Sequence, residues 1–370
     1  MTRSVLSRLS LALAAGIAVV GVSIGAAGAQ DRAKTVRVWN WPDYMDKSAL
    51  ADFEKETGFK LEYDDTMPGN EELETAILGG KIEYDVVVPT ATFLSRDVKA
   101  KAYQPLDKSK IPNLKNYWPE IAAKVTKYDP DNKYSINWMW GTVGIGYNVK
   151  KIKERLKDAP VDSWKLVYDP DNAKKLKDCG ILMLDSPEDI LPSILAYLGI
   201  DPDTRKIEDY RKATDHLRKI APFVRKFQTQ GYIEALAQGD YCAVVGYSGD
   251  IIQARAGAKD GVEIAYSVPK EGAQLWFDQM AIPAAAKNVD GAHAFINYVL
   301  KPEVHAAASN LTRYANGNIA AKPLIKEEIT KDPTIYPDEA MMKHLFTVTT
   351  LDDKLQPQVT RLWTQAKRGK

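Results

Sequence analysis

Apolar and polar residues follow two periods in the first half of the chain, one typical of strands and one typical of helices. Strands are predicted over residues 35–39, 59–63 and 84–89. The segments between them, 46–58 and 70–80, space their apolar residues as one face of a helix does, and each ends in glycine. The last strand, YDVVVP, is apolar throughout, as in a strand buried on both faces. This order predicts an α/β fold with a mostly parallel, doubly wound sheet flanked by helices.

A second series of alternating elements begins at residue 142. Its expected strands are 142–148, 180–185, 241–248, 262–269 and 276–283. Helices are predicted after Pro187, from Asp250 and over 291–300. No Ser/Gly-rich linker separates the two series, so we expect two lobes joined by strands that cross between them more than once. Such an arrangement forms a hinge.

The first 29 residues have the composition of a signal peptide. Arg3 and Arg8 precede an apolar stretch rich in Ala and Gly, and Ala27-Gly28-Ala29 offers a cleavage site. A membrane anchor is the alternative, but the stretch ends in this site, and no later segment reaches the roughly 20 apolar residues of a spanning helix. We expect a soluble exported protein that is cleaved after Ala29.

Charge and length narrow the class of protein further. Removing the signal leaves 48 basic and 49 acidic residues, so neither nucleic acid nor an anionic membrane is expected as partner. The remaining chain, roughly 340 residues, exceeds one comfortable core and indicates two domains. The only two cysteines, Cys179 and Cys242, favour a disulfide in an oxidising compartment, with two separate buried thiols as the alternative.

Aromatic and acidic residues follow several predicted strands. In open α/β sheets, ligands bind beyond the carboxyl ends of the strands. The residues at these positions that bear chemistry are Trp41, Asp43, Thr90, Thr92, Glu188, Asp189, Tyr247, Ser248 and Asp250, and the strand at 276–283 opens with Trp276 and Asp278.

No catalytic or metal-binding motif accompanies these residues. The stretch GYSGD (246–250) lacks the second glycine of a G-x-S-x-G elbow, and GTVGIG (141–146) has its glycines in the wrong order for a dinucleotide loop. The four histidines fall in predicted helices without metal-ligand spacing. We therefore expect no enzyme activity, no cofactor and no metal.

Rings and carboxylates without a metal or nucleophile suit an organic cation with an apolar stem. A ring face attracts an ammonium by about 0.5–2 kcal/mol, a buried methylene contributes about 0.8 kcal/mol, and a hydrogen bond to a charged group about 1.5–3 kcal/mol. A diamine held by two carboxylates could thus reach the roughly −8 kcal/mol of micromolar binding. A sugar would require Asn, Gln and Arg as much as Asp, and an anion would be repelled.

Ordinary structural roles compete with this interpretation. Trp41 suits core packing. Asp43, Asp250 and Thr90 suit helix N-caps, and Glu188 and Asp189 fit a first helical turn, where acids are favoured. Asp278 lies in a strand and has no capping role. A different class of protein, a secreted hydrolase using Asp43 and Asp278 as acid and base, would also use paired carboxylates.

Longer stretches resemble a known family. The chain is similar to the periplasmic polyamine-binding proteins of bacterial ABC importers, nearest the putrescine-binding branch, over almost its whole mature length. The stretches that carry the resemblance are NWPDY, FEKETG, YDVVVPTATF, YQPLDKSK, WGTVGIGYN, PVDSW, CGILMLDSPED, GDYCAVVGYSGD, PKEG, WFD and YANGN. The resemblance implies a two-lobed, type II periplasmic binding protein without catalysis, a monomer that delivers putrescine or spermidine to a permease in the inner membrane.

The resemblance also implies boundaries, a site and a disulfide. The first lobe would comprise 30–140 and 263–312, and the second 141–262 and 313–370. The residues expected to line the cleft are Trp41, Asp43, Thr90, Asp189, Tyr247, Asp250, Trp276, Asp278 and Tyr314. Asp250 and Asp278 would hold ammonium groups, the rings at 41, 247 and 276 would sandwich the methylenes, and Tyr314 would close the wall. The family disulfide falls at Cys179 and Cys242.

Four positions depart from the putrescine-binding pattern. Pro42 stands in place of Ser or Thr, Tyr247 in place of Trp, and Asp189 in place of Glu. Trp276 is the residue of spermidine binders, where putrescine binders carry Phe. Most of the sequence favours putrescine and this last position favours a longer amine, so both ligands stay open. An amino acid, a sugar or a ferric ion in the same fold are the alternatives.

Overall fold

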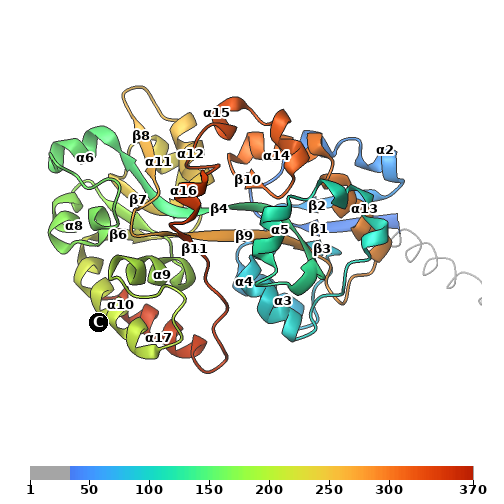
Figure 1. Cartoon of the computed structure of the whole chain (residues 1–370), viewed down its shortest axis with the longest axis horizontal. Coiled ribbons are helices and arrows are strands. Elements are labelled where there is room, and N and C mark those ends of the chain that lie inside the picture. The colour runs from blue at the N-terminus through green and yellow to red at the C-terminus, as the bar shows by residue number, and fades with distance from the viewer. Residues whose placement is uncertain (1–33, 370) are drawn as a thin grey trace, which may run out of the picture.

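Two long strands, β4 (Ser135–Asn148) and β9 (Ala273–Ala281), run through the middle of the protein and connect its two halves (Figure 1). The structure is a computed structural model that describes residues 34–369. Every residue of β9 is buried, as are all but one of β4. The signal peptide predicted over 1–29 lies outside the described residues.

The first half, here called the first lobe, is built on parallel strands. It contains β1, β2 and β3 in the order β2-β1-β3, followed by β9 and the Ser135–Thr142 part of β4, which are antiparallel. The bounds of its short strands are β1 Thr35–Trp39, β2 Lys60–Asp64, β3 Val86–Val87 and β10 Ala315–Asn316. The helices between or after these strands are α2 Phe53–Thr57, α3 Asn70–Leu78, α4 Ala91–Lys99, α5 Pro119–Val125, α13 Val289–Val299 and α14 Pro302–Thr312, with 3-10 turns at Lys47–Leu50, Lys108–Lys110, Pro112–Asn116, Pro130–Asn132 and Ile319–Leu324.

The second half, here called the second lobe, repeats the plan. The Val143–Asn148 part of β4 pairs with β7 on one side and β8 on the other, and β5 continues the sheet between β7 and β6. Its strands are β5 Ile181–Met183, β6 Val224–Phe227, β7 Ala243–Tyr247 and β8 Ile264–Ser267. The helices around them are α6 Val149–Arg155, α7 Lys165–Tyr168, α8 Pro170–Leu176, α9 Pro187–Tyr197, α10 Ile207–Ile220, α11 Ile233–Ala237, α12 Ser248–Ala256 and α17 Gln356–Ala366, with a 3-10 turn at Ala221–Phe223.

Several predicted elements differ in extent from the observed ones. The helix predicted over 46–58 is two pieces, a 3-10 turn capped by Asp46 and then α2, which Gly58 ends in the left-handed conformation with φ 73°. The strand predicted to begin at 142 begins at Ser135, because the preceding apolar residues continue the same strand. His344 lies in a turn and not in a helix.

A disulfide connects Cys179 and Cys242, with 5.4 Å between their Cα atoms. The two residues precede β5 and β7, which are parallel neighbours in the sheet of the second lobe. The expected pairing is therefore present, and it fastens adjacent strands that lie 63 residues apart in sequence.

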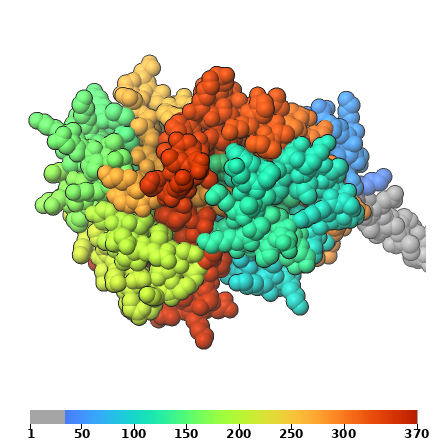
Figure 2. All heavy atoms as spheres, in the orientation of Figure 1, coloured from blue at the N-terminus to red at the C-terminus, as the bar shows by residue number. Residues whose placement is uncertain are grey.

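A C-terminal segment, here called the strap (residues 347–351), lies in the seam between the lobes (Figure 2). It follows the two short elements α15 (Glu327–Thr330) and α16 (Glu339–Met342) and the strand β11 (Leu345–Phe346), which pairs with β9 at Ala273 and Gln274. No helix among residues 34–369 is both long and apolar enough to cross a bilayer.

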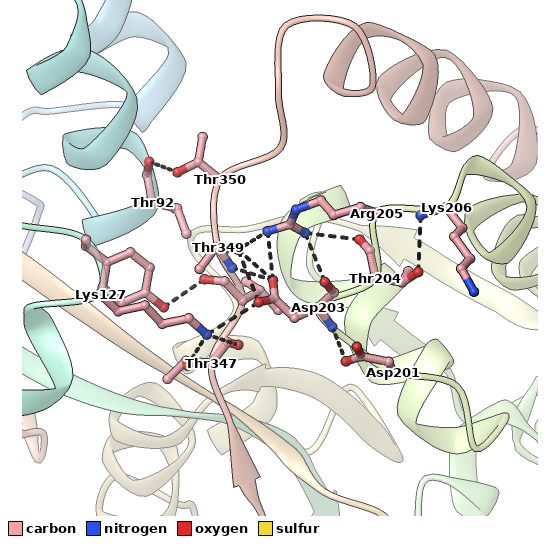
Figure 3. A network of polar contacts seen from close by, with 12 residues as sticks. Thr92, Lys127, Asp201, Asp203, Thr204, Arg205, Lys206, Thr347, Thr349 and Thr350 are labelled. Atoms are coloured by element: carbon pink, nitrogen blue, oxygen red, sulfur yellow. Dashed lines mark hydrogen bonds and ion pairs between the residues drawn. The ribbon is translucent and has the colours of Figure 1, made fainter.

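Both lobes bind the strap through polar contacts (Figure 3). On the first lobe, Tyr128 Oη donates to the Val348 carbonyl at 2.7 Å, and Thr350 Oγ1 donates to the Thr92 carbonyl at 2.6 Å. On the second lobe, Asp203 accepts from the main-chain N–H of Thr349 at 2.6 Å. The strap therefore connects the two lobes beside the crossing strands.

Candidate functional site

Three carboxylates from different elements lie where the lobes meet. Asp278 is on β9, Asp189 is in the first turn of α9, and Asp250 is in the first turn of α12. Asp278 and Asp189 are only 7% and 8% exposed, and Asp250 is partly buried. Helix N-termini favour negative charge, which stabilises two of the three.

Asp278 accepts hydrogen bonds from two neutral hydroxyls. Tyr44 Oη donates to its Oδ2 and Thr90 Oγ1 to its Oδ1, both at 2.8 Å. Thr90 is the N-cap residue of α4, but its side chain makes no capping bond. Asn70 Nδ2 donates to the same Oγ1 at 3.0 Å, which leaves the Thr90 proton for Asp278. The capping alternative for Thr90 is therefore excluded.

Asp189 and Asp250 also accept from neutral donors. Tyr247 Oη donates to Asp189 at 2.9 Å, and Gln274 Nε2 donates to its other oxygen at 3.3 Å. Tyr314 Oη donates to Asp250 at 2.6 Å. None of the ion pairs formed by residues 34–369 includes any of these three carboxylates.

Burial dominates the electrostatics of this cluster. Loss of water raises the pKa of Asp278 to about 7 and that of Asp250 to about 6, against the lowering effect of the hydroxyl donors. It raises the pKa of Asp189 as well. The charge of Asp189 adds to the pKa shift of Asp278. Buried carboxylates without a cationic partner are costly, so a cation at this place would be strongly stabilised.

Aromatic rings fill the space between the carboxylates. Trp276 lies between two tyrosines, with its ring centroid 5.7 Å from Tyr247 and 5.1 Å from Tyr314, both edge to face. Tyr44 meets Tyr314 at 5.7 Å in the same manner. Burial raises the pKa of these three tyrosines well above the ordinary value, so their hydroxyls stay protonated and donate.

Two glycines make room for these rings. A Cβ atom at Gly141 would lie 2.7 Å from the Trp276 ring, and one at Gly249 would lie 2.6 Å from the Tyr314 ring. Both distances are shorter than any real contact. Gly141 is on β4 opposite Trp276, and Gly249 is in the first turn of α12 beside Asp250. The backbone of both lobes is thus shaped around the aromatic side chains.

The predicted residues are placed as follows. Direct contacts connect Thr90 with Asp278, Tyr247 with Asp189 and Trp276, and Tyr314 with Asp250 and Trp276. Asp43 is exposed, has φ 54°, and its charge raises the pKa of Asp250. Trp41 is partly buried, packs against the hydrophobic core, and donates from Nε1 to the Val88 carbonyl at 2.9 Å.

Sequence reasoning missed four residues of the cluster. Tyr44 and Asn70 support Asp278 directly or through Thr90, Gln274 supports Asp189, and Tyr232 hydrogen-bonds to Asp250 and lowers its pKa. Strand alternation from Trp276 and Asp278 could have found Gln274. Tyr232 precedes α11, at a position with no recognisable pattern.

A metal centre finds no support in this arrangement. Across the described part of the chain, no group of three His, Cys, Asp or Glu side chains gathers as a metal ion would require. The site consists of anionic side chains, tyrosine hydroxyls and ring faces. Its chemistry suits binding of an organic cation through charge, hydrogen bonds and apolar contact.

Comparison with known proteins agrees with this architecture. Residues 48–337 match the family described as bacterial extracellular solute-binding protein. The chain is 47% identical over 358 residues to the putrescine-binding periplasmic protein PotF of Escherichia coli, covering 95% of this chain and 96% of PotF. It is also 47% identical to the putrescine-binding periplasmic protein SpuD of Pseudomonas aeruginosa, covering 98% of each.

A solved structure gives the same answer for the fold. The spermidine/putrescine ABC transporter substrate-binding protein PotD of Streptococcus pneumoniae superposes with a TM-score of 0.76 at 31% identity, covering 91% of this chain and 99% of that one. PotF and SpuD are named as binding proteins and PotD as the substrate-binding protein of an ABC transporter, which confirms the expected two-lobed type II fold and a binding protein rather than an enzyme. The chain is a member of the bacterial extracellular solute-binding proteins.

Proposed function

We propose that this protein is a receptor that captures a linear polyamine between its two lobes and delivers it to the permease of an ABC importer. One observation carries the proposal. Asp189 and Asp278 are buried and Asp250 is partly buried around aromatic rings, and among residues 34–369 all three accept hydrogen bonds only from neutral groups. A dication supplies the missing positive charges, and its methylenes lie against the rings.

The residues of the proposed site contact different parts of the ligand. Asp278 and Asp250 bind ammonium groups, and Asp189 and Asp43 add negative charge. Trp41, Tyr247 and Trp276 contact the methylenes, while Tyr314 closes the wall and orients Asp250. Thr90 orients Asp278. The names of relatives support a polyamine: PotF and SpuD are putrescine-binding, and other relatives bind spermidine as well. Putrescine and spermidine are therefore the two candidate ligands.

Capture would work through closure of the lobes. The ligand contacts Asp278 and Thr90 on one side and Asp189, Tyr247 and Asp250 on the other, so it binds the closed form better than the open form. Exclusion of water strengthens each charge contact. The permease then needs only to recognise the closed shape.

We also propose that the protein is exported to the periplasm and is a monomer there. The relatives are named as periplasmic, which supports export. Cleavage of the signal after Ala29 is a further part of the proposal. The lobes would be 30–140 with 263–312 and 141–262 with 313–370, except that β8 pairs with the second-lobe part of β4 and β10 with its first-lobe part. No nucleic acid takes part.

Isothermal titration calorimetry at pH 8 tests the function. Putrescine, spermidine, cadaverine and agmatine are titrated, with glutamate, maltose and ferric citrate representing the other solute classes. We expect at least one polyamine to bind with a Kd of about 1 μM or tighter, near −8 kcal/mol. Binding of every polyamine weaker than millimolar would overturn the proposal, and tight binding of another class would replace it.

A further inference from the structure

Gln274 shares a face of β9 with two residues of the site. Side chains alternate along a strand, so Gln274, Trp276 and Asp278 point the same way. Trp276 contacts both Tyr247 and Tyr314, and Asp278 accepts from Tyr44 and Thr90. Gln274 is 4% exposed. It therefore belongs to the same buried surface.

The amide of Gln274 is only half satisfied. Its Nε2 donates to Asp189 Oδ1 at 3.3 Å, while Tyr247 donates to Oδ2. Its Oε1 is buried and has no hydrogen-bond partner among residues 34–369. An ionised carboxylate only accepts, which fixes the amide with its NH₂ group toward Asp189. The carbonyl oxygen is thus an unused acceptor, and a buried acceptor without a donor is costly.

Gln274 and Asp278 lie far apart along β9. Four residues of extended chain separate the two Cα atoms by about 13 Å. Trp276 stands between them. One end of this strand face therefore carries Asp278 with its two hydroxyl donors, and the other end carries Gln274 with Asp189.

We propose that Gln274 is a further ligand-binding residue that helps to set amine length. Its Oε1 accepts a hydrogen bond from an ammonium at the end of the polyamine remote from Asp278, and its Nε2 positions Asp189 for the same group. This inference rests on the proposed function. An acceptor at this position recognises N–H groups and leaves a shorter or uncharged chain end without a contact.

Two substitutions separate the acceptor role from mere support of Asp189. Gln274→Met keeps the length of the side chain and removes both donor and acceptor. Gln274→Glu keeps an acceptor oxygen and removes the donor. Gln279→Met is the matched control, because Gln279 is a buried glutamine on the opposite face of β9 that accepts from Ser135.

Calorimetry at pH 8 with putrescine and spermidine provides the readout. We expect Gln274→Met to weaken binding of the preferred amine about tenfold. Gln274→Glu should weaken it less, because it keeps the acceptor and loses only the donor to Asp189, and Gln279→Met should keep the wild-type affinity within about threefold. Unchanged affinity in Gln274→Met would overturn the inference. Equal losses in the Met and Glu variants would also overturn it, because Gln274 would then act only as a donor to Asp189, and an equal loss in Gln279→Met would show an effect not specific to the site.

Failure of this inference differs from failure of the function. If the wild-type protein binds no polyamine, the proposed function itself is wrong. If the wild-type protein binds tightly and Gln274→Met binds equally well, only the role of Gln274 is wrong. A thermal unfolding curve for each variant shows whether it is folded before the titration.

Discussion

Asp278 is the residue on which binding depends most in the proposed site. It is buried at the lobe junction with two hydroxyl donors and no ion-pair partner among residues 34–369. Two neutral hydrogen bonds do not offset the loss of hydration of a full charge. An ammonium ion placed against it would form a buried pair, and such a pair is strongly destabilised when one partner is removed.

Replacing this charge should weaken binding. Asp278→Asn keeps the shape of the side chain and leaves one ammonium without its counter-charge, so we expect a loss of about 2 kcal/mol or more, near thirtyfold in Kd. Calorimetry at pH 8 measures it. Asp290→Asn serves as control, because it removes an exposed charge of α13 that is paired with Lys110. An affinity equal to wild type in Asp278→Asn would exclude Asp278 from the site.

The raised pKa values of Asp278 and Asp250 predict a pH dependence. Without ligand these groups titrate at pKa about 7 and about 6. A bound cation favours the ionised form and lowers both pKa values, so binding near pH 7 releases protons, while the amines stay charged. Affinity should therefore fall as pH drops from 8 to 5.5, by up to about tenfold per pH unit for each group that must ionise.

The same shifts bear on stability. A carboxyl with a raised pKa stabilises the ligand-free fold fully below its ordinary pKa of about 4, and this contribution is lost as pH rises to the folded-state pKa of about 6 for Asp250 and about 7 for Asp278. Stabilisation by ligand should grow over this range.

The pH dependence of binding is measured by titrations at pH 5.5, 6.5 and 8 in buffers of different ionisation enthalpy, which count the released protons. A pH-independent Kd with no proton release would contradict this account.

The role of a side chain could be predicted from the sequence only where no ordinary structural role, such as helix capping, explained the residue equally well. Asp278 in a strand had no capping role to compete with binding, and it lies in the cluster. Thr90 suited a helix cap equally well, and only the structure shows that its hydroxyl donates to Asp278. Tyr44 and Tyr232 support carboxylates distant in sequence, so no local pattern could indicate them.

Among the elements of the fold, the strap forms hydrogen bonds that join the two lobes independently of any ligand. Tyr128, Lys127 and Thr92 of the first lobe all bind strap residues. Lys127 Nζ also lies 3.4 Å from Asp203 Oδ2 of the second lobe. In the lobe-closure mechanism, opening would break these bonds, so they favour the closed form without touching ligand.

Weakening the strap should lower affinity without changing selectivity. Tyr128→Phe removes the bond to the Val348 carbonyl, worth about 1 kcal/mol, so Kd should rise about fivefold for putrescine and spermidine alike. Small-angle scattering of the ligand-free variant should show a larger radius of gyration. Tyr117→Phe loses a hydroxyl bonded within the first lobe and serves as control. A changed ratio of the two affinities would place Tyr128 in the site instead.

Element boundaries were predicted less well than element types. The alternating segment at 35–39 coincides with β1, because its period is undisturbed. The strand beginning at Ser135 was recognised only from residue 142, since SINWMWG is buried on both faces and shows no alternation. Pairing of β4 first with β9 and then with β7 is a tertiary property that periodicity cannot reveal.

For the whole molecule, we expect the disulfide to stabilise the second lobe. In the chain-entropy model, a bridge closing 63 residues contributes about 4 kcal/mol. The Cys179→Ala/Cys242→Ala variant should therefore unfold at a clearly lower temperature. Differential scanning calorimetry measures the shift, and reduction of the wild-type protein should reproduce it. An unchanged unfolding temperature would show that the fold does not rely on this bridge.

The two-lobed architecture followed from the sequence because no linker separated the two α/β series. The C-terminal strap did not, since residues 347–351 have no periodicity and are placed by contacts with both lobes. A preference between putrescine and spermidine could not be predicted from the fold, because in the proposed site amine length depends on a few side chains such as Trp276 and Gln274.

Comparison of putrescine with 1,4-butanediol shows whether positive charge governs recognition at this site. The two molecules share a four-carbon chain, but only putrescine carries the positive charges that the carboxylates of Asp189, Asp250 and Asp278 lack. At pH 8 we expect calorimetry to give a Kd in the micromolar range or tighter for putrescine and no measurable binding of the diol, a difference of at least about 4 kcal/mol. Binding of the diol within tenfold of the diamine would contradict the account.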